Sequence, residues 1–579
     1  MPIRAKVHGQ HEESSIVRVQ LGFRWAIALY ALIDCWIYRF YINSDGVSYL
    51  DIGDQYWKGN WQAALNAYWS PLYSWLTGLM FCVTKPTMRW EYPEVHLLNF
   101  VILVAALFCF EFFWRELLAW RGDNAWAGSS RLYAWILGYL LFAYVHFVVT
   151  PILIPTPDLM LVTPDLIVAA LVYLASGMIL RFATGRMCTV SAGLFGGLLG
   201  VGYLAKTAML PFAIVIMMTM LAVAWRQHGR KWMIGATLLG FLIVSLPFII
   251  ALSLHEHRFT FGDTGKINYA IEVNGMPARH WQGDEPGHTK ALHPTRKIFS
   301  WPQVYEFAEP VAGTYPIWYD RSYWNAGINS SMHPVRQIRV LVGNAMRIAQ
   351  YLVAETGFLT AVLMMMFLLS DRIKESWQIL MGFFPILVPA IAMFLMYAMV
   401  LSPSESWEPR YFIGVTVVAW GAVIASTCIS GEEKRIKVLR ASSLILGIMV
   451  LCSMLNVLER DYGFNREESS QVNEYRPYIV AEQLRTMGMR PGDHVAVISS
   501  TTGNSHWARL EKVKIIAEVM DTDDTSSVFW TSGKECEETV LSVLKSIGVT
   551  AVIADKPPRV LLPGWVPVGN TGYAVYFFR

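Results

Sequence analysis

The chain reads Asp45-Gly-Val-Ser-Tyr-Leu-Asp-Ile-Gly-Asp54 directly after its first hydrophobic segment. Three acids therefore stand where a membrane helix would meet water, and aromatic residues follow them as far as Ser70-Pro-Leu-Tyr73. Carboxylates beside a bilayer are costly unless they are solvated, paired or used in function. The stretch favours a membrane protein, and one of its acids is a candidate to act on a substrate carried by a lipid.

The composition agrees with this interpretation. Hydrophobic residues make up 54% of the 579 residues and charged residues 16%, whereas a soluble protein carries about a quarter charged residues. We therefore expect an integral membrane protein with one or more water-soluble parts. The formal net charge of +3 is close to neutral and argues against nucleic-acid binding.

Eleven apolar runs have a length suited to crossing a bilayer, although the fifth is short. They fall near residues 24–42, 94–113, 132–150, 165–180, 191–205, 208–225, 232–254, 340–370, 377–401, 411–429 and 441–457. The segment 71–84 is also apolar, but it is too short to span comfortably and it begins with Pro71. We interpret it as a re-entrant or interfacial helix.

Basic residues are concentrated in every second connection between these runs. They are Arg115, Arg121 and Arg131; Arg181 and Arg186; Arg226, Arg230 and Lys231; Arg372 and Lys374; and Lys434, Arg435, Lys437 and Arg440. Basic loops stay on the cytoplasmic side of a membrane, so the pattern predicts a cytoplasmic N-terminus and eleven spans. The loops 43–93 and 255–339 and the C-terminus then lie outside.

Two larger polar parts lie on this outer side. Residues 255–339 are rich in Trp, Tyr, His and Pro, as in Arg279-His-Trp281, which fits a belt at the membrane surface or a sugar-stacking surface. Residues 463–579 alternate strand and helix patterns and predict a small extracytoplasmic α/β domain. This domain has no glycine-rich nucleotide motif, so we expect it to dock partners or acceptor. The transmembrane domain would occupy residues 1–460.

Asp45 is the first candidate for chemistry. An Asp at this position could cap the helix that follows, but a cap does not explain why Asp51 and Asp54 come so soon after it. We favour Asp45 as a general base that takes a proton from an acceptor hydroxyl. Asp51 and Asp54 are interpreted as solvated or supporting residues.

A Thr-Pro-Asp triplet occurs twice in the chain and gives a second acidic candidate site. Thr163-Pro-Asp165 is typical of a helix start, and Thr156-Pro-Asp158 repeats the triplet seven residues earlier. Both acids are predicted on the same face as Asp45. They could orient an acceptor or hold a divalent cation.

Lys206 and Arg410 are the basic residues of the short outer loops. Each could simply extend to the lipid headgroups. A phosphate carried on a lipid would nevertheless need such partners, and Arg can bind it with two parallel hydrogen bonds. We therefore predict that both residues bind a donor phosphate.

Together these pieces resemble the GT-C class of membrane glycosyltransferases, in particular the polyprenyl-phosphate-sugar-dependent group with protein O-mannosyltransferases and aminoarabinose transferases of lipid A. The resemblance covers the chain to about residue 430. Its matching pieces are Asp45 with Tyr49-Leu-Asp-Ile52 and Ser70-Pro-Leu-Tyr73, Thr163-Pro-Asp165, Ala205-Lys206, and Glu408-Pro-Arg-Tyr411. The family's first-loop Asp-Glu pair is replaced here by Asp45-Gly46.

The resemblance implies a GT-C-like transmembrane fold and an inverting transfer of a sugar from a polyprenyl-phosphate donor to a hydroxyl acceptor at the outer membrane face. It implies that Asp45 is the base, that Asp165, or as second choice Asp158, is the second acid, and that Lys206 and Arg410 hold the donor phosphate. Contacts to acceptor or sugar are expected from Tyr49, Tyr73, Glu408 and Trp281. The sugar, the acceptor (glycan, lipid or protein) and a metal requirement stay open. The expected location is a bacterial inner membrane, with the C-terminal domain periplasmic or extracellular.

Three other functions remain open. A flippase or transporter of a lipid-linked saccharide would show broken helices near the midplane and internal repeats, which the sequence does not suggest. A lipid-linked oligosaccharide ligase would share the phosphate chemistry and use basic and His residues of a large loop, for which His280, His288 and His293 are candidates. A non-catalytic assembly factor would use its outer domain to recruit partners.

Overall fold

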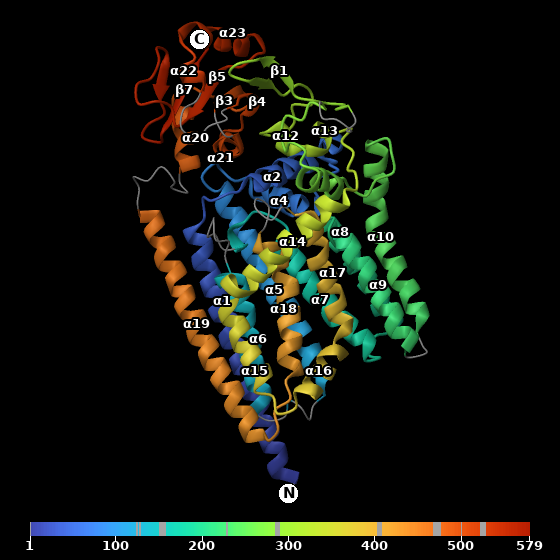
Figure 1. Ribbon diagram of the computed structural model, residues 1–579. Helices are drawn as coiled ribbons and strands as arrows, with labels where there is room; N and C mark the ends of the chain where they lie inside the picture. The colour runs from blue at the N-terminus through green and yellow to red at the C-terminus, as the bar shows by residue number, and fades with distance from the viewer. Residues whose placement is uncertain are drawn as a thin grey trace.

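The computed structural model describes residues 2–122, 126, 129–149, 158–226, 230–283, 290–401, 408–466, 476–498, 501–520 and 528–578. Long helices form a bundle, and a small sheet with its own helices covers one end of it (Figure 1). The N-terminus lies at the opposite end of the bundle (Figure 1). We call the covered end of the bundle the sheet end.

The bundle consists of helices suited to a membrane, so the chain is an integral membrane protein. Within the described residues, eight helical segments are long and apolar enough to cross a bilayer, and up to ten if each of two bent pairs forms one span. The eight are α1 (Pro2–Ile37), α5 (Glu91–Arg121), α6 (Ser129–Ala143) with η1 (Tyr144–Val148), α7 (Asp165–Ala183), α9 (Met209–Arg226), α10 (Lys231–His255), η5 (Pro409–Phe412) with α18 (Ile413–Ser426), and α19 (Glu432–Arg466).

The bent pairs and one shorter helix complete the bundle. The pairs are α14 (Pro334–Gln350) and η4 (Tyr351–Glu355) with α15 (Gly357–Leu368), and α16 (Ile373–Gly382) with α17 (Phe384–Val400); the shorter apolar helix is α8 (Thr189–Ala205). Every apolar run of the sequence coincides with one of these helices or pairs. The count of eleven spans stays a prediction.

Close packing of α8 on α10 fixes the position of the residue that ends α8. A Cβ atom on Gly196 would lie 1.8 Å from the Thr237 carbonyl oxygen, and one on Gly240 would lie 2.0 Å from the Gly193 carbonyl oxygen. Small residues therefore let the two backbones touch, as is common between membrane helices. Lys206 is the C-cap of α8, so its backbone is positioned by the packing of α8 on α10.

The first loop folds into three helices at the sheet end, α2 (Ser44–Trp57), α3 (Trp61–Ala64) and α4 (Pro71–Thr84). The helices α2 and α4 cross with backbone contact, because a Cβ on Gly53 would lie 2.7 Å from the Ser74 carbonyl oxygen. They lie between the bundle and the sheet (Figure 1). The segment 71–84 is thus a 14-residue helix packed on α2, and its interfacial location stays a prediction.

The sheet combines two parts of the chain that are distant in sequence. Its order is β1-β2-β4-β3-β5-β7-β6. The strands are β1 (Arg296–Phe299), β2 (Val304–Glu306), β3 (His494–Ile498), β4 (Lys514–Val519), β5 (Ala551–Asp555), β6 (Trp565–Pro567) and β7 (Tyr573–Phe577). Strand β3 pairs in parallel with β4 and β5, and the other pairings are antiparallel. Because β2 pairs with β4, the long loop and the C-terminal part share one sheet.

Short helices complete both polar parts. In the long loop these are α11 (Thr264–Asn268), η3 (Tyr269–Val273), α12 (Pro316–Tyr319) and α13 (Arg321–Trp324); in the C-terminal part they are α20 (Arg476–Thr486), α21 (Thr501–Glu511), α22 (Val528–Thr531) and α23 (Lys534–Ser546). The 3-10 helix η2 (Asp158–Met160) precedes α7. The α/β architecture of the C-terminal part agrees with the sequence pattern.

Candidate active site

The ends of several helices line a cavity of about 600 Å³. Asp45 comes from the first turn of α2, Asp165 begins α7, Lys206 ends α8, and Arg410 lies in η5 before α18. Charged residues at or near the ends of helices are thereby brought together from four distant segments. The sequence-based prediction that these four residues lie near one another therefore agrees with the geometry.

Asp45 faces a cation and an indole. Its Oδ2 atom lies 3.3 Å from Nη2 of Arg410, and its Oδ1 atom accepts a hydrogen bond of 3.3 Å from Nε1 of Trp318. The N-cap position of α2 is held by Asn43, so Asp45 is not the helix cap. Its side chain is 24% exposed, which leaves the carboxylate accessible from the cavity.

Asp165 joins the two cations. Its Oδ1 atom lies 2.5 Å from Nζ of Lys206, and its Oδ2 atom accepts a hydrogen bond of 2.9 Å from Oγ1 of Thr163. The Nε atom of Arg410 lies 3.6 Å from the same Oδ2 atom. Asp165 therefore holds Lys206 and Arg410 in place on one side of the cavity.

Arg410 is the central cation of the site. Its side chain is 6% exposed, and its Nε atom lies 2.5 Å from Oε2 of Glu408. Its Nη1 atom is buried and has no hydrogen-bond partner among the described residues. A buried guanidinium that keeps a free N–H group is suited to accept an anionic ligand.

The charges around the cavity balance. Four carboxylates and four cations line it: Asp45, Asp165, Glu272 and Glu408 against Lys206, Lys266, Arg321 and Arg410. Burial raises the pKa of Glu408, although the Arg410 charge offsets part of this effect. The neutral form of Glu408 is therefore favoured relative to an exposed glutamate, which shifts the cavity towards positive charge.

Aromatic rings form part of the wall. The rings of Tyr397 and Tyr411 stack at 5.2 Å, and Nζ of Lys206 lies 4.1 Å from the Tyr411 ring centroid. Tyr49 lines the cavity, whereas Tyr73 is buried against it and donates a hydrogen bond to Asn99. The electron-rich faces of Tyr411 and Tyr397 therefore lie beside the ammonium group, which is 5.9 Å from the Tyr397 ring centroid.

Three of the expected residues are not among the described residues that line the cavity, namely Tyr73, Trp281 and Asp158. Trp281 is buried in a separate cluster of the long loop with Ile267 and Ile328, and it does not line the cavity. Asp158 begins η2, but its side chain lies outside the described residues. Arg321 and Trp318 line the cavity without having been selected from the sequence. The aromatic run Tyr315-Pro-Ile-Trp-Tyr319 was the available signal for this segment.

The histidines of the long loop have other contacts. His280 pairs with the buried carboxylate of Glu518 on β4 and stacks on Tyr305 at 3.9 Å, and His293 stacks on Tyr323 at 4.1 Å. His288 lies outside the described residues. None of the described histidines lines the cavity. Among the described residues, no group of three or more His, Cys, Asp or Glu could hold a metal ion, so we propose no metal site.

Comparisons with known proteins give a match in structure alone. No family model matches the sequence, and no curated protein is similar to it in sequence. The structure is similar to that of ArnT from Cupriavidus metallidurans bound to undecaprenyl phosphate, with a TM-score of 0.53 at 11% identity over 96% of this chain and 97% of that chain. The apo form of the same ArnT gives a TM-score of 0.52 at 10% identity, over 93% of each chain.

The chain has the GT-C fold. The similarity extends over the helix bundle and the sheet end, because nearly the whole of both chains is covered. The fold expected from the four sequence pieces is therefore confirmed.

Within this GT-C fold, the C-terminal part is joined to α2 by a buried ion cluster. Nη1 of Arg509 on α21 lies 2.7 Å from Asp51 and 2.9 Å from Asp54, and its Nε lies 2.6 Å from Glu91. Lys512 also pairs with Glu91, at 2.5 Å. Asp51 and Asp54 thus support the helix that carries Asp45. Of the two roles considered from sequence, solvated or supporting, their burial and ion pairs agree with the supporting role.

The electrostatics of this cluster act differently on its two α2 acids, favouring the ionised form of Asp54 and the neutral form of Asp51. Burial alone would raise the pKa of Asp54, but the charges of Arg509 and Lys512 lower that pKa below its ordinary value. Burial of Asp51 raises its pKa even though Arg509 partly offsets the effect. Removing one partner of such a buried cluster leaves uncompensated charge behind.

Replacing Arg509 with glutamine is expected to destabilise the protein by about 3–5 kcal/mol. Among the described cations, the three carboxylates would then keep only Lys512, beside Glu91, and the exposed Lys58, whose Nζ lies 3.8 Å from Asp54. Thermal unfolding and amide hydrogen exchange of α2 and α21 measure the effect. Arg559→Gln is the matched control, because Arg559 is exposed. Equal unfolding temperatures for Arg509→Gln and Arg559→Gln would contradict the role of the cluster.

Proposed function

We propose that this protein is a glycosyltransferase that moves a sugar from a polyprenyl-phosphate donor to a hydroxyl acceptor, with inversion at the anomeric carbon. The observation that carries the proposal is the cavity in which a carboxylate and two cations from distant segments face one another, with Asp45 3.3 Å from Arg410. The GT-C fold supports a membrane glycosyltransferase in general terms. The proposal assigns the chemistry to residues 1–460 and docking to residues 463–579.

The donor phosphate would bind to Arg410 and Lys206. The free N–H group of Arg410 and the ammonium of Lys206 are donors of the kind that phosphate oxygens accept with short, charge-assisted bonds. Asp165 keeps both cations in position. The leaving group is already an anionic phosphate, so these cations stabilise the charge that grows on it as the bond breaks.

The acceptor hydroxyl would be activated by Asp45. Its carboxylate takes the hydroxyl proton while the acceptor oxygen forms a bond to the anomeric carbon. The bond between that carbon and the phosphate oxygen breaks, and its electron pair remains on the lipid phosphate. One displacement of this kind inverts the anomeric centre and needs no nucleotide.

The similar fold of ArnT with bound undecaprenyl phosphate supports a polyprenyl donor. The alternation of basic loops supports placing the cavity at the outer membrane face, in a bacterial inner membrane with the N-terminus in the cytoplasm. Tyr49 and Glu408 line the cavity and are proposed to contact acceptor or sugar. Tyr73 acts through its contact with Tyr49.

A donor screen tests this function. Purified protein in lipid vesicles is given isotopically labelled sugars on polyprenyl monophosphate, on polyprenyl diphosphate and on nucleotides, together with a membrane extract that supplies acceptors. Label should transfer from the monophosphate donors, and free polyprenyl phosphate should appear in equal amount. Transfer restricted to diphosphate-linked oligosaccharides would favour the ligase alternative, and transfer from nucleotide sugars alone would refute the proposal.

The pH dependence of donor use is expected to report on Lys206. Burial lowers the pKa of Lys206 below its ordinary value of 10.5, and the Arg410 charge adds to this effect while Asp165 opposes it. A neutral Lys206 binds phosphate poorly, so kcat/KM for the donor should fall on the alkaline side at a pH below 10.5. Lys206→Arg should move this fall to higher pH.

The titration of Lys206 changes stability and donor use in opposite directions, so unfolding does not explain the alkaline fall in kcat/KM. The unfolded chain binds the Lys206 proton more tightly than the folded chain does, so the contribution of this group to stability rises with pH over the same range. Thermal unfolding measured at each pH is the control. An alkaline fall that is unchanged in Lys206→Arg would contradict the assignment.

A further inference from the structure

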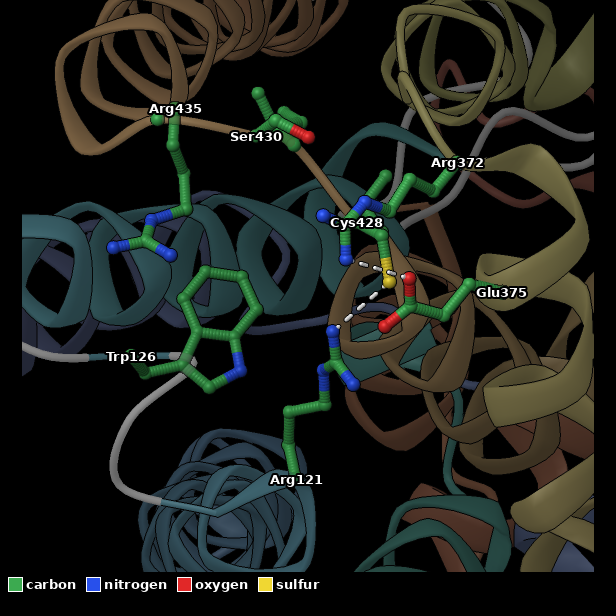
Figure 2. Close-up of a pocket in the computed structure, with 10 residues that line it drawn as sticks. Arg121, Trp126, Arg372, Glu375, Cys428, Ser430 and Arg435 are labelled. Atoms are coloured by element: carbon green, nitrogen blue, oxygen red, sulfur yellow. Dashed lines mark hydrogen bonds and ion pairs between the residues drawn. The ribbon is translucent and has the colours of Figure 1, made fainter.

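A second cavity, of about 380 Å³, lies at the end of the bundle opposite the sheet. Figure 2 shows its lining. Arg121 comes from the last residue of α5, Arg372 and Glu375 from the start of α16, Cys428 from the connection between α18 and α19, and Arg435 from α19. Trp126 closes another side (Figure 2). This cavity shares no lining residue with the proposed active site.

Positive charge dominates the lining. The lining holds three guanidinium groups and one carboxylate, Glu375, which lies 3.2 Å from Nη1 of Arg372. Arg121 donates a hydrogen bond of 3.0 Å to the Cys428 sulfur, and Arg435 donates one of 3.0 Å to the Ser130 hydroxyl. Within the described part of the chain, neither Arg121 nor Arg435 forms an ion pair. Neutral partners compensate a guanidinium only weakly.

Two buried N–H groups of the second cavity have no hydrogen-bond acceptor among the described residues. The Nε atom of Arg121 and the Nε1 atom of Trp126 have no hydrogen-bond partner among the described residues, and Trp126 is 5% exposed. Figure 2 shows the nitrogen edge of the Trp126 ring turned towards Arg121 and Cys428. A buried indole N–H group normally finds an acceptor. Both of these unpartnered groups are donors, and with the excess of guanidinium groups they suit an acceptor with negative charge.

We propose that this second cavity binds a phosphate group, carried either by an anionic lipid headgroup or by free phosphate. Guanidinium groups bind phosphate oxygens with paired, charge-assisted hydrogen bonds, and Trp126 supplies one more donor. The apolar helices α5 and α18 end here at Arg121 and Ser426, and α19 begins at Glu432. Helix ends of this kind stand at headgroup depth in a bilayer, which favours the lipid as the source.

The experiment uses the full-length protein, purified in detergent and stripped of lipid. Binding of phosphatidylglycerol, phosphatidylcholine and inorganic phosphate is measured by native mass spectrometry and by thermal unfolding. Phosphatidylglycerol should bind at least about tenfold more tightly than phosphatidylcholine. The double variant Arg121→Gln/Arg435→Gln should lose about tenfold or more in this affinity. Trp126→Phe, which removes one N–H donor and little volume, should lose several-fold.

Arg440→Gln is the matched control, because Arg440 is an exposed arginine of the same helix, α19, as Arg435. Its affinity should stay within about twofold of wild type. Competition by inorganic phosphate would support recognition of the phosphate group itself, and binding of phosphatidylglycerol without such competition would assign the site to the lipid. The proposal would be overturned if neither phosphatidylglycerol nor inorganic phosphate bound, or if wild type, Trp126→Phe and the double variant bound phosphatidylglycerol equally.

Discussion

Asp45→Asn is expected to lower kcat for sugar transfer by about 10²–10⁴-fold. Asparagine keeps the shape of the side chain and a partner for Trp318, but it cannot take a proton from the acceptor hydroxyl. The loss corresponds to about 3–5 kcal/mol of transition-state stabilisation. The KM for the donor should change little, because Arg410 keeps Asp165 and Glu408 beside it. Steady-state kinetics with varied donor and saturating acceptor measure both values.

The control for this variant is Asp493→Asn. Asp493 lies in the C-terminal part, where its carboxylate accepts a hydrogen bond from the Arg490 backbone N–H, and it does not line the cavity. Both variants should unfold at the temperature of the wild type, and Asp493→Asn should keep its activity. A wild-type kcat in Asp45→Asn would remove the general base from the account.

Arg410→Lys is expected to lower kcat/KM for the donor by about 10²–10³-fold, the usual loss when one donor to a developing anion is removed. Lysine keeps the positive charge beside Asp45, Asp165 and Glu408, so the buried carboxylates stay compensated. It cannot reproduce the planar fork of guanidinium donors that binds phosphate twice. Donor-dependent initial rates and direct binding of polyprenyl phosphate check this expectation.

Alanine at position 410 gives a different and less specific result. It removes the cation from three carboxylates and is expected to destabilise the fold by about 3–5 kcal/mol, so low activity of Arg410→Ala would have two causes. Arg559→Lys, a change of the same kind at an exposed position, controls for the substitution itself. If Arg410→Lys used the donor as well as Arg559→Lys does, Arg410 would not be a phosphate ligand.

The sequence was informative where physical chemistry acts locally. Each candidate charge stands beside an apolar segment of the sequence, Asp45 and Lys206 after one and Asp165 and Arg410 at or before the start of one. The alternation of basic loops predicts one common face for these positions. A common face does not by itself bring the four residues together, and the structure adds that they line one cavity. The resemblance to the GT-C class supplied the roles that these residues were expected to have.

Contacts between distant segments were not predictable in this way. Strands β1 and β2 have four and three residues, too few for a period-two pattern to be distinguished. Strand β2 pairs with β4, about 200 residues further along the chain, and β1 joins the sheet only through β2. Trp281 is a residue that was expected at the site and lies elsewhere. Aromatic density alone does not distinguish a core residue of the loop from a residue of the cavity.

One feature of the sequence points to the Arg509 cluster. Arg509 interrupts an apolar run in Trp507-Ala-Arg-Leu510, and a charge within a buried helix face requires partners. The identity of those partners, Asp51, Asp54 and Glu91, follows only from the docking of α21 on α2 and α5.

A structure of the protein with bound polyprenyl phosphate tests the central claim most directly. The account predicts that the phosphate lies within hydrogen-bonding distance of Arg410 and Lys206, with Asp45 on the opposite side of the space left for the sugar. A phosphate held elsewhere, with these two cations still paired only to Asp45, Asp165 and Glu408, would contradict it.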